Sequence, residues 1–150
     1  MTNSTNKDWM QGKADQEMFM QMFNHKYKQQ LIEYPSKFAP IDFIMVDGKD
    51  VIGFVEYKHR QIKSDQYEYI VIDHNKMKKL REHKEGSNQS SYLVITYLDG
   101  TFVYEVTGQV FEIEYGGRTT KTRNQYDIKV VEKIPSTKFK HINNVFKENQ

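Results

Sequence analysis

Three residues in the first half of the chain could carry hydrolytic chemistry: Asp42, Glu56 and Lys58. Side chains alternate along the run 51–58, so Glu56 and Lys58 end one otherwise apolar face. If 48–50 forms a three-residue hairpin loop, Asp42 on the partner strand lies opposite Glu56 on this face. Two carboxylates with Cβ atoms about 4.5–5.5 Å apart destabilise a strand pair unless a cation lies between them. A hard divalent cation such as Mg²⁺, which takes oxygen ligands, meets that need.

Lys58 is the next side chain on the same face. Its side chain could orient a metal-bound water, deprotonate that water as a neutral amine, or stabilise as an ammonium the negative charge that develops on phosphorus. The alternative is a surface salt bridge among Asp42, Glu56 and Lys58, because Glu-x-Lys is a common pattern. A register slip of one residue would also move Asp42 to the other face. The spacing therefore leaves a hydrolytic site and a salt bridge both open.

An N-terminal helix and a hairpin must position these residues. Residues 1–8 are polar and lack a periodic pattern, which predicts a loose arm. The segment 9–24 is expected to be an amphipathic helix packed on a sheet, because apolar residues recur at every fourth position with two phenylalanines beside them: Met10, Ala14, Met18, Met22, Phe19 and Phe23. Strands are predicted at 27–34, 41–46 and 51–57.

A second helix and further strands follow. Asp73 is placed to cap a helix over 74–83, and the segment 67–72 before it fits either a strand or a buried approach to the helix. More strands are expected at 92–97, 102–106, 109–115 and 126–134. The order of helix, three strands, helix and strands favours an α/β or α+β fold.

The composition limits the class of protein. The chain has 150 residues, which is enough for one domain with a real core, and no Cys, which excludes thiolate chemistry and disulfides. No apolar run approaches the roughly 20 residues of a membrane span, so we expect no membrane partner and a cytoplasmic location. The five His residues show no zinc-binding spacing.

The chain contains Pro40-Ile41-Asp42 and, after a gap of 13 residues, Glu56-Tyr57-Lys58. This motif resembles the signature of the PD-(D/E)XK nuclease superfamily. The predicted elements are similar to the αβββαβ core of that restriction-endonuclease-like fold, a mixed sheet flanked by helices, over about residues 9–106. The resemblance implies one nuclease domain over 1–150, in which 107–150 is a basic extension with extra strands.

The resemblance also implies a set of roles. Asp42, Glu56 and the backbone carbonyl of Tyr57 would bind Mg²⁺, with Mn²⁺ able to substitute, and Lys58 would assist the attacking water. A carboxylate of the first helix often joins the metal shell in this family; Glu17 is the expected residue and Asp15 the alternative.

The function implied is a Mg²⁺-dependent DNA endonuclease, either site-specific, as homing or restriction enzymes are, or structure-specific, as junction resolvases are. Duplex cleavage by so small a domain suggests a homodimer or a higher homo-oligomer. The small size is similar to that of nucleases encoded by phages, which would act in the host cell. The alternatives are a non-catalytic nucleic-acid-binding or interaction module on the same fold, and a nuclease directed at RNA.

Basic residues supply candidates for contacts with DNA. In 116–150, Lys and Arg outnumber Asp and Glu by eight to three. Phosphate contacts are expected from five cations outside the motif: Arg60, Lys76, Arg118, Lys121 and Arg123. A solvated surface is the competing interpretation for the lysines of the second helix and for the tail.

Overall fold

The computed structural model describes residues 4–36, 39–117 and 128–149. Its elements are α1 (Ser4–Lys26), β1 (Gln30–Glu33), β2 (Phe43–Asp47), β3 (Asp50–His59), β4 (Tyr69–Asp73), α2 (His74–Ser87), β5 (Ser90–Tyr97), β6 (Gly100–Glu105), β7 (Glu112–Gly117), β8 (Ile128–Pro135) and β9 (Lys140–His141). Two short 3₁₀ turns, Ser136–Lys138 and Ile142–Asn144, flank β9.

A six-stranded mixed sheet forms the centre of the molecule, in the order β1-β2-β3-β5-β6-β9. Only the central pair, β3 and β5, is parallel; the other neighbours are antiparallel. The helix α2 lies in the connection between the two parallel strands, as a crossover requires. This architecture confirms the predicted α/β class with a mixed sheet between helices.

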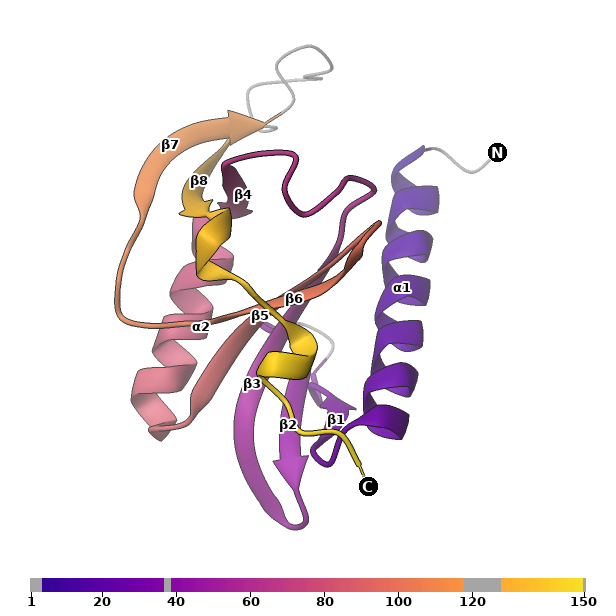
Figure 1. Cartoon of the computed structure of the whole chain (residues 1–150). Coiled ribbons are helices and arrows are strands. Elements are labelled where there is room, and N and C mark those ends of the chain that lie inside the picture. The colour runs from indigo at the N-terminus through magenta and orange to yellow at the C-terminus, as the bar shows by residue number, and fades with distance from the viewer. Residues whose placement is uncertain (1–3, 37–38, 118–127, 150) are drawn as a thin grey trace.

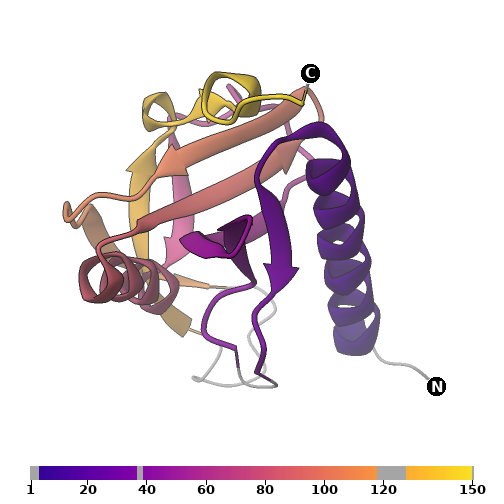
Figure 2. The same cartoon turned by 90° about the horizontal axis from the view of Figure 1, so that it is seen from below.

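The two helices cover opposite faces of this sheet (Figures 1 and 2). Side chains alternate along β3, so Val55 packs with Phe19 and Phe23 of α1. Phe54, one residue earlier, packs with Met77 and Leu80 of α2 on the other face. The middle of β3, residues 53–57, is thus buried on both sides.

The segment that the sequence left ambiguous forms β4. It pairs with β8 rather than with the central sheet, and β8 pairs with β7 to make a separate three-stranded sheet. Ile72 and Ile134 from this sheet join the cluster around α2. Asp73 caps α2 as predicted, because its side chain accepts a hydrogen bond of 2.8 Å from the backbone N–H of Asn75.

The N-terminal helix differs from its prediction in length and in orientation. It begins at Ser4, inside the segment expected to be a loose arm. The methionine stripe faces outward: Met10 and Met18 are 60% and 69% exposed, whereas Phe19 and Phe23 are buried. Burial of the larger aromatic surface decides which face packs on the sheet.

The C-terminal segment completes the same face. β9 adds the last strand beside β6, and Ile142 and Phe146 are buried against the residues of α1. The ring of Phe146 packs edge-on against Phe23 at 5.2 Å between centroids. Part of the region that the sequence sets apart as an extension therefore belongs to the hydrophobic core.

Candidate active site

Asp42 lies immediately before β2, where the chain enters the sheet. Its Oδ2 accepts a hydrogen bond of 2.8 Å from the backbone N–H of Tyr57, and its Oδ1 accepts one of 3.2 Å from the side-chain amide of Gln16. Its own carbonyl accepts from the N–H of Tyr34. Contacts from α1 and β3 thus fix the orientation of this carboxylate, and Tyr34 holds its backbone.

Glu56 lies across from Asp42 for a reason that the sequence did not show. The hairpin turn has two residues, since Asp47 pairs with Asp50 around Gly48 at φ +62°, so the predicted three-residue loop is wrong. A β-bulge between β2 and β3 then shifts the register by one residue, and Phe43 faces Val55. Continuing this register by one residue on each strand places Asp42 opposite Glu56, as predicted.

The carboxylate of Glu56 is almost fully buried, at 2% exposure. Its Oε2 lies 3.5 Å from the Nζ of Lys58 and 3.6 Å from that of Lys76, while its Oε1 has no hydrogen-bond partner among the described residues. Burial raises the pKa of Glu56 to about 7, and the charge of Asp42 adds to that rise. Lys58 and Lys76 counteract the rise.

The two lysines reach Glu56 from different elements. Lys58 follows it on the same face of β3, as predicted, and its side chain is 28% exposed. Lys76 comes from the first turn of α2. The sequence placed Lys76 among contacts to a DNA backbone, whereas the fold directs it to the motif carboxylate. Helical geometry alone could not show this, because it depends on how α2 crosses β3.

The helix α1 contributes Gln16 to the site rather than Glu17. Gln16 contacts Asp42, but Glu17 is exposed, and no hydrogen bond or ion pair connects it to Asp42 or Glu56 within the described residues. Asp15, the alternative, lies 3.9 Å from Nδ1 of His59. The burial of Phe19 and Phe23 turns Gln16 toward the sheet, since positions i, i+3 and i+7 share a face.

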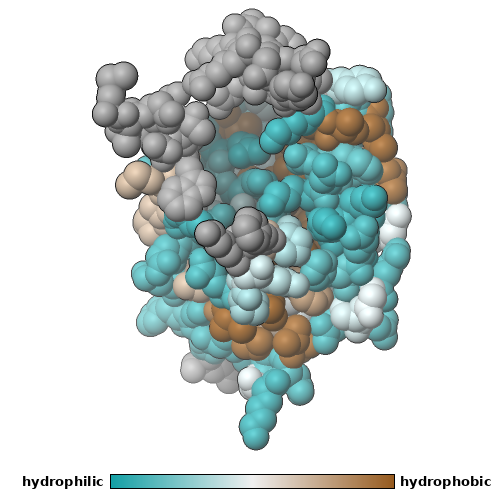
Figure 3. Space-filling model, turned by 180° about the vertical axis from the view of Figure 1, so that it is seen from behind, coloured by the Kyte–Doolittle hydropathy of each residue, from teal (hydrophilic) through white to brown (hydrophobic). Residues whose placement is uncertain are grey.

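Two cavities near the motif share Gln16 as a lining residue. One, of about 610 Å³, is lined by Lys13, Tyr34 and Asp42. The other, of about 450 Å³, is lined by Tyr57 and Lys58. Figure 3 shows one face of the molecule, with a hollow lined by hydrophilic residues in its upper part. Open polar space therefore borders Asp42 in one cavity and Lys58 in the other.

The remaining residues expected to bind DNA are only partly accounted for. Arg60 directly follows β3, is exposed and lines the same cavity as Lys58. Arg118, Lys121 and Arg123 lie outside the described residues. The His59 side chain contacts Asp15 rather than Glu56.

A buried ion pair behind the site was not predicted. Glu132 of β8 is fully buried and accepts a forked pair of hydrogen bonds from Arg81 of α2, together with hydrogen bonds from His74 and from the N–H of Phe111. Burial by itself raises the pKa of Glu132, but these hydrogen bonds outweigh it and lower the pKa below its ordinary value. The network ties α2, and with it Lys76, to the three-stranded sheet.

The donor atoms at the motif fit a hard divalent cation. Two carboxylates and the carbonyl of Tyr57 would supply oxygen ligands, and the buried, unpartnered Oε1 of Glu56 lacks the partner that such a group normally has. Clusters of three or more His, Cys, Asp or Glu side chains suited to a metal are absent from the described part of the chain. Water and substrate oxygens would have to complete the shell, which is usual for Mg²⁺.

Comparison with known families shows to which family the chain belongs. A model of the family described as "Phage putative PDDEXK endonuclease" matches residues 7–142. The chain belongs to this family. The resemblance drawn from the motif is thereby confirmed, and membership places the chain among nucleases. The match includes β7, β8 and β9, so the family extends well beyond the core recognised from the motif.

A solved structure shares the fold. The chain is similar to Hjc, a Holliday junction resolvase of the archaeal hyperthermophile Archaeoglobus fulgidus, with a TM-score of 0.53 and 14% identity over 91% of this chain and 93% of that one. At this identity the likeness concerns the fold alone. A search of curated proteins finds no significant match. Within the described residues, neither helix has both the length and the apolar composition needed to span a bilayer.

Proposed function

We propose that the chain is a Mg²⁺-dependent endonuclease that hydrolyses phosphodiester bonds in DNA, with Mn²⁺ able to substitute. The observation that carries this proposal is Glu56: it is buried, it lies opposite a second carboxylate, and one of its oxygens is unpartnered. A glutamate kept only for a salt bridge would gain nothing from this arrangement, because an unpaired buried oxygen destabilises the fold.

Asp42, Glu56 and the carbonyl of Tyr57 would hold the cation. The hydrogen bond from the N–H of Tyr57 and that from Gln16 keep the carboxylate of Asp42 in place. Burial on both faces of β3 does the same for Glu56. When bound, a divalent cation supplies Lewis-acid activation of water and neutralises charge on the phosphate oxygens.

The lysines supply fixed positive charge at the reacting phosphate. A water molecule attacks phosphorus, a new P–O bond forms, and the bond to the leaving sugar oxygen breaks in line with it. The water loses a proton to solvent, and the leaving oxygen takes one from solvent. Lys58 donates to the attacking water or to a phosphoryl oxygen, where negative charge increases in the transition state. Lys76, on the other side of Glu56, adds to the same positive field.

Contacts with the DNA backbone are proposed for Arg60 and for Arg118, Lys121 and Arg123. Each phosphate contact releases counterions, so replacing the last three residues by Ser should weaken binding and reduce the salt slope by up to about three. An unchanged slope would show that these residues do not contact DNA.

Duplex cleavage would need a homodimer or higher oligomer. The likeness to a junction resolvase makes a four-way junction the first DNA to test.

Cleavage tests the proposal directly. Wild type and Lys58→Ala are incubated with supercoiled plasmid, linear duplex, single strand, four-way junction and RNA, in Mg²⁺, Mn²⁺ or EDTA. We expect metal-dependent cutting of DNA by wild type and its loss in the variant. Lys49→Ala replaces an exposed lysine in the hairpin turn; it is the matched control and should cut normally. DNA binding without any cutting would favour a non-catalytic module, and cutting of RNA alone would favour an RNA-directed nuclease.

A further inference from the structure

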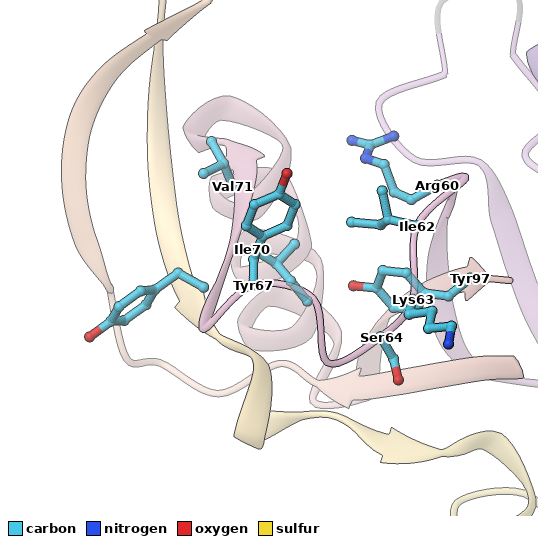
Figure 4. A pocket seen from close by; sticks show the side chains of 9 residues that line it. Arg60, Ile62, Lys63, Ser64, Tyr67, Ile70, Val71 and Tyr97 are labelled. Atoms are coloured by element: carbon cyan, nitrogen blue, oxygen red, sulfur yellow. The ribbon is translucent and has the colours of Figure 1, made fainter. Parts of the chain in front are cut away.

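A third cavity lies beside the candidate active site, on the other side of Arg60. Arg60 lines both this cavity and the one that contains Lys58. The volume is about 310 Å³, at the small end of the range of about 300–1,000 Å³ for ligand sites. Figure 4 shows Tyr67, Ile70 and Val71 along one wall, with Arg60, Ile62 and Tyr97 facing them.

The cavity combines an apolar interior with cations at its border. Tyr67 is 58% exposed, so its ring is accessible to a ligand in this cavity. Arg60 and Lys63 are both exposed and line the same space. An aromatic ring beside cations suits a planar ligand that carries negative charge nearby.

Tyr97 provides a polar group that the fold leaves unused. The residue is 5% exposed, its hydroxyl points toward the space between the two walls (Figure 4), and this hydroxyl has no hydrogen-bond partner among the described residues. Burial raises the pKa of Tyr97 to about 12, so the hydroxyl stays protonated at neutral pH and can donate. Buried polar groups normally have a partner, and a ligand atom could be that partner here.

The loop that forms one wall is held in place without a ligand. Ser64 donates to Asp99 through its N–H at 2.9 Å and through its hydroxyl at 2.6 Å. The N–H of Leu98 donates to the carbonyl of Ile62 at 3.0 Å. These contacts fix the loop to the end of β5 and lower the entropy that binding would cost.

We propose that this cavity binds one unpaired nucleobase of the DNA strand whose phosphate lies at the active site. The base stacks on Tyr67, a ring nitrogen or carbonyl accepts from the hydroxyl of Tyr97, and Arg60 contacts the adjoining phosphate. Arg60 is two residues from Lys58, or about 6.6 Å of extended chain, so the base belongs to a nucleotide near the scissile bond. This inference rests on the proposed function and adds a substrate class to it: DNA with an unpaired or displaced base at the cutting point.

Removal of a base from the DNA tests the proposal. Binding is measured by fluorescence anisotropy in EDTA, with bulged, flapped and four-way-junction duplexes and with copies in which single unpaired nucleotides are replaced by an abasic analogue. In wild type, loss of the base at one position should weaken binding about 5- to 100-fold, the effect of losing one base–aromatic stack. In Tyr67→Ala that difference should nearly vanish.

Two further variants separate the role of each tyrosine. Tyr97→Phe removes only the hydroxyl, so it should reduce the effect of base removal a few-fold without lowering the melting temperature. Tyr115→Ala is the matched control, because Tyr115 is 83% exposed on β7 and does not line the cavity. It should leave the effect of base removal unchanged.

Cleavage of the same DNAs in Mg²⁺ reports the proposed function independently. Equal affinity of wild type for intact and abasic DNA at every position would overturn the nucleobase site, and continued cutting would leave the nuclease intact. A base effect that persists in Tyr67→Ala would also overturn this site. DNA that is neither bound nor cut would overturn both proposals.

Discussion

Glu56 and Glu132 are the two buried carboxylates of the described residues, and their surroundings are opposite. Glu132 receives hydrogen bonds from Arg81, His74 and the N–H of Phe111, which together satisfy both of its oxygens. Glu56 has two lysines near one oxygen at 3.5 and 3.6 Å, and its other oxygen has no hydrogen-bond partner in the described part of the chain. Burial raises the pKa of Glu56 to about 7, while hydrogen bonding lowers that of Glu132.

This difference separates a carboxylate that stabilises the fold from one that is available for chemistry. Burial of a charge is tolerated when its hydrogen bonds are complete, as they are around Glu132. A buried carboxylate whose hydrogen bonds are incomplete lowers the stability of the fold. Such carboxylates are typical of sites that bind a ligand or a metal. Both glutamates reach α2, so one helix connects the structural pair to the candidate active site.

The largest expected difference between Glu56 and Glu132 concerns DNA cleavage. Glu56→Gln or Asp42→Asn should reduce Mg²⁺-dependent cutting by more than about 100-fold, since a metal contributes several kcal/mol to the transition state. DNA binding should persist or improve, because each change removes negative charge facing phosphate. Wild-type cutting rates in both variants would show that these carboxylates do not hold the metal.

The free energy of unfolding should change most when Glu132 is replaced. Glu132→Gln leaves Arg81 buried without its counter-charge and should lower the free energy of unfolding by about 3–5 kcal/mol at pH 7. The pKa of Glu132 is lowered by folding, so its contribution is present above pH 4.5 and is lost as the pH falls through the folded-state pKa. Urea unfolding at pH 7 and pH 4 measures this, and equal stability of variant and wild type at pH 7 would refute it.

Glu56→Gln should have the opposite effect on stability. Folding raises the pKa of Glu56 from 4.5 to about 7, so the folded state binds the extra proton and loses stability as the pH rises between these values. In EDTA the variant should therefore be more stable than wild type at pH 8 by about 1–3 kcal/mol, and about equally stable at pH 4. A variant less stable than wild type at pH 8 would mean that the lysines overcompensate burial.

The smallest effects are expected from substitutions of the α2 residues that contact each glutamate. Lys76→Ala should reduce cutting about tenfold, or about 1.4 kcal/mol, because Lys58 remains beside Glu56. His74→Ala should instead lower the free energy of unfolding by about 1–2 kcal/mol with little change in cutting. Lys78→Ala, exposed on the same helix, is the control. If Lys76→Ala lowered stability and His74→Ala reduced cutting instead, the assignment of Lys76 to the active site and of His74 to the buried ion pair would be wrong.

The same structure limits how the basic tail can be tested. Deletion of 116–150 would remove β8, β9 and the buried side chains of Ile134 and Phe146. Such a truncation would measure the loss of the core rather than the loss of phosphate contacts. Substitution of Arg118, Lys121 and Arg123 is therefore the informative experiment.

The sequence by itself determined the motif, the strand alternation and the order of the first elements. Alternation along β3 has a period of two that local sterics impose, so Glu56 and Lys58 had to share a face. Asp73 was recognisable as a cap because capping depends on the residue type and its immediate neighbours. These features need only a few residues of chain, and that is why they could be predicted.

The tertiary structure decided what lies around the motif. The β-bulge restored the register that the shorter turn would have lost, and packing of Phe19 and Phe23 selected Gln16 rather than Glu17 to contact Asp42. The crossing of α2 over β3 brought Lys76 to Glu56. The pairing of β4 with β8 fixed the position of Glu132. Each outcome depends on contacts between segments distant in the chain, where burial of apolar surface outweighs local preference.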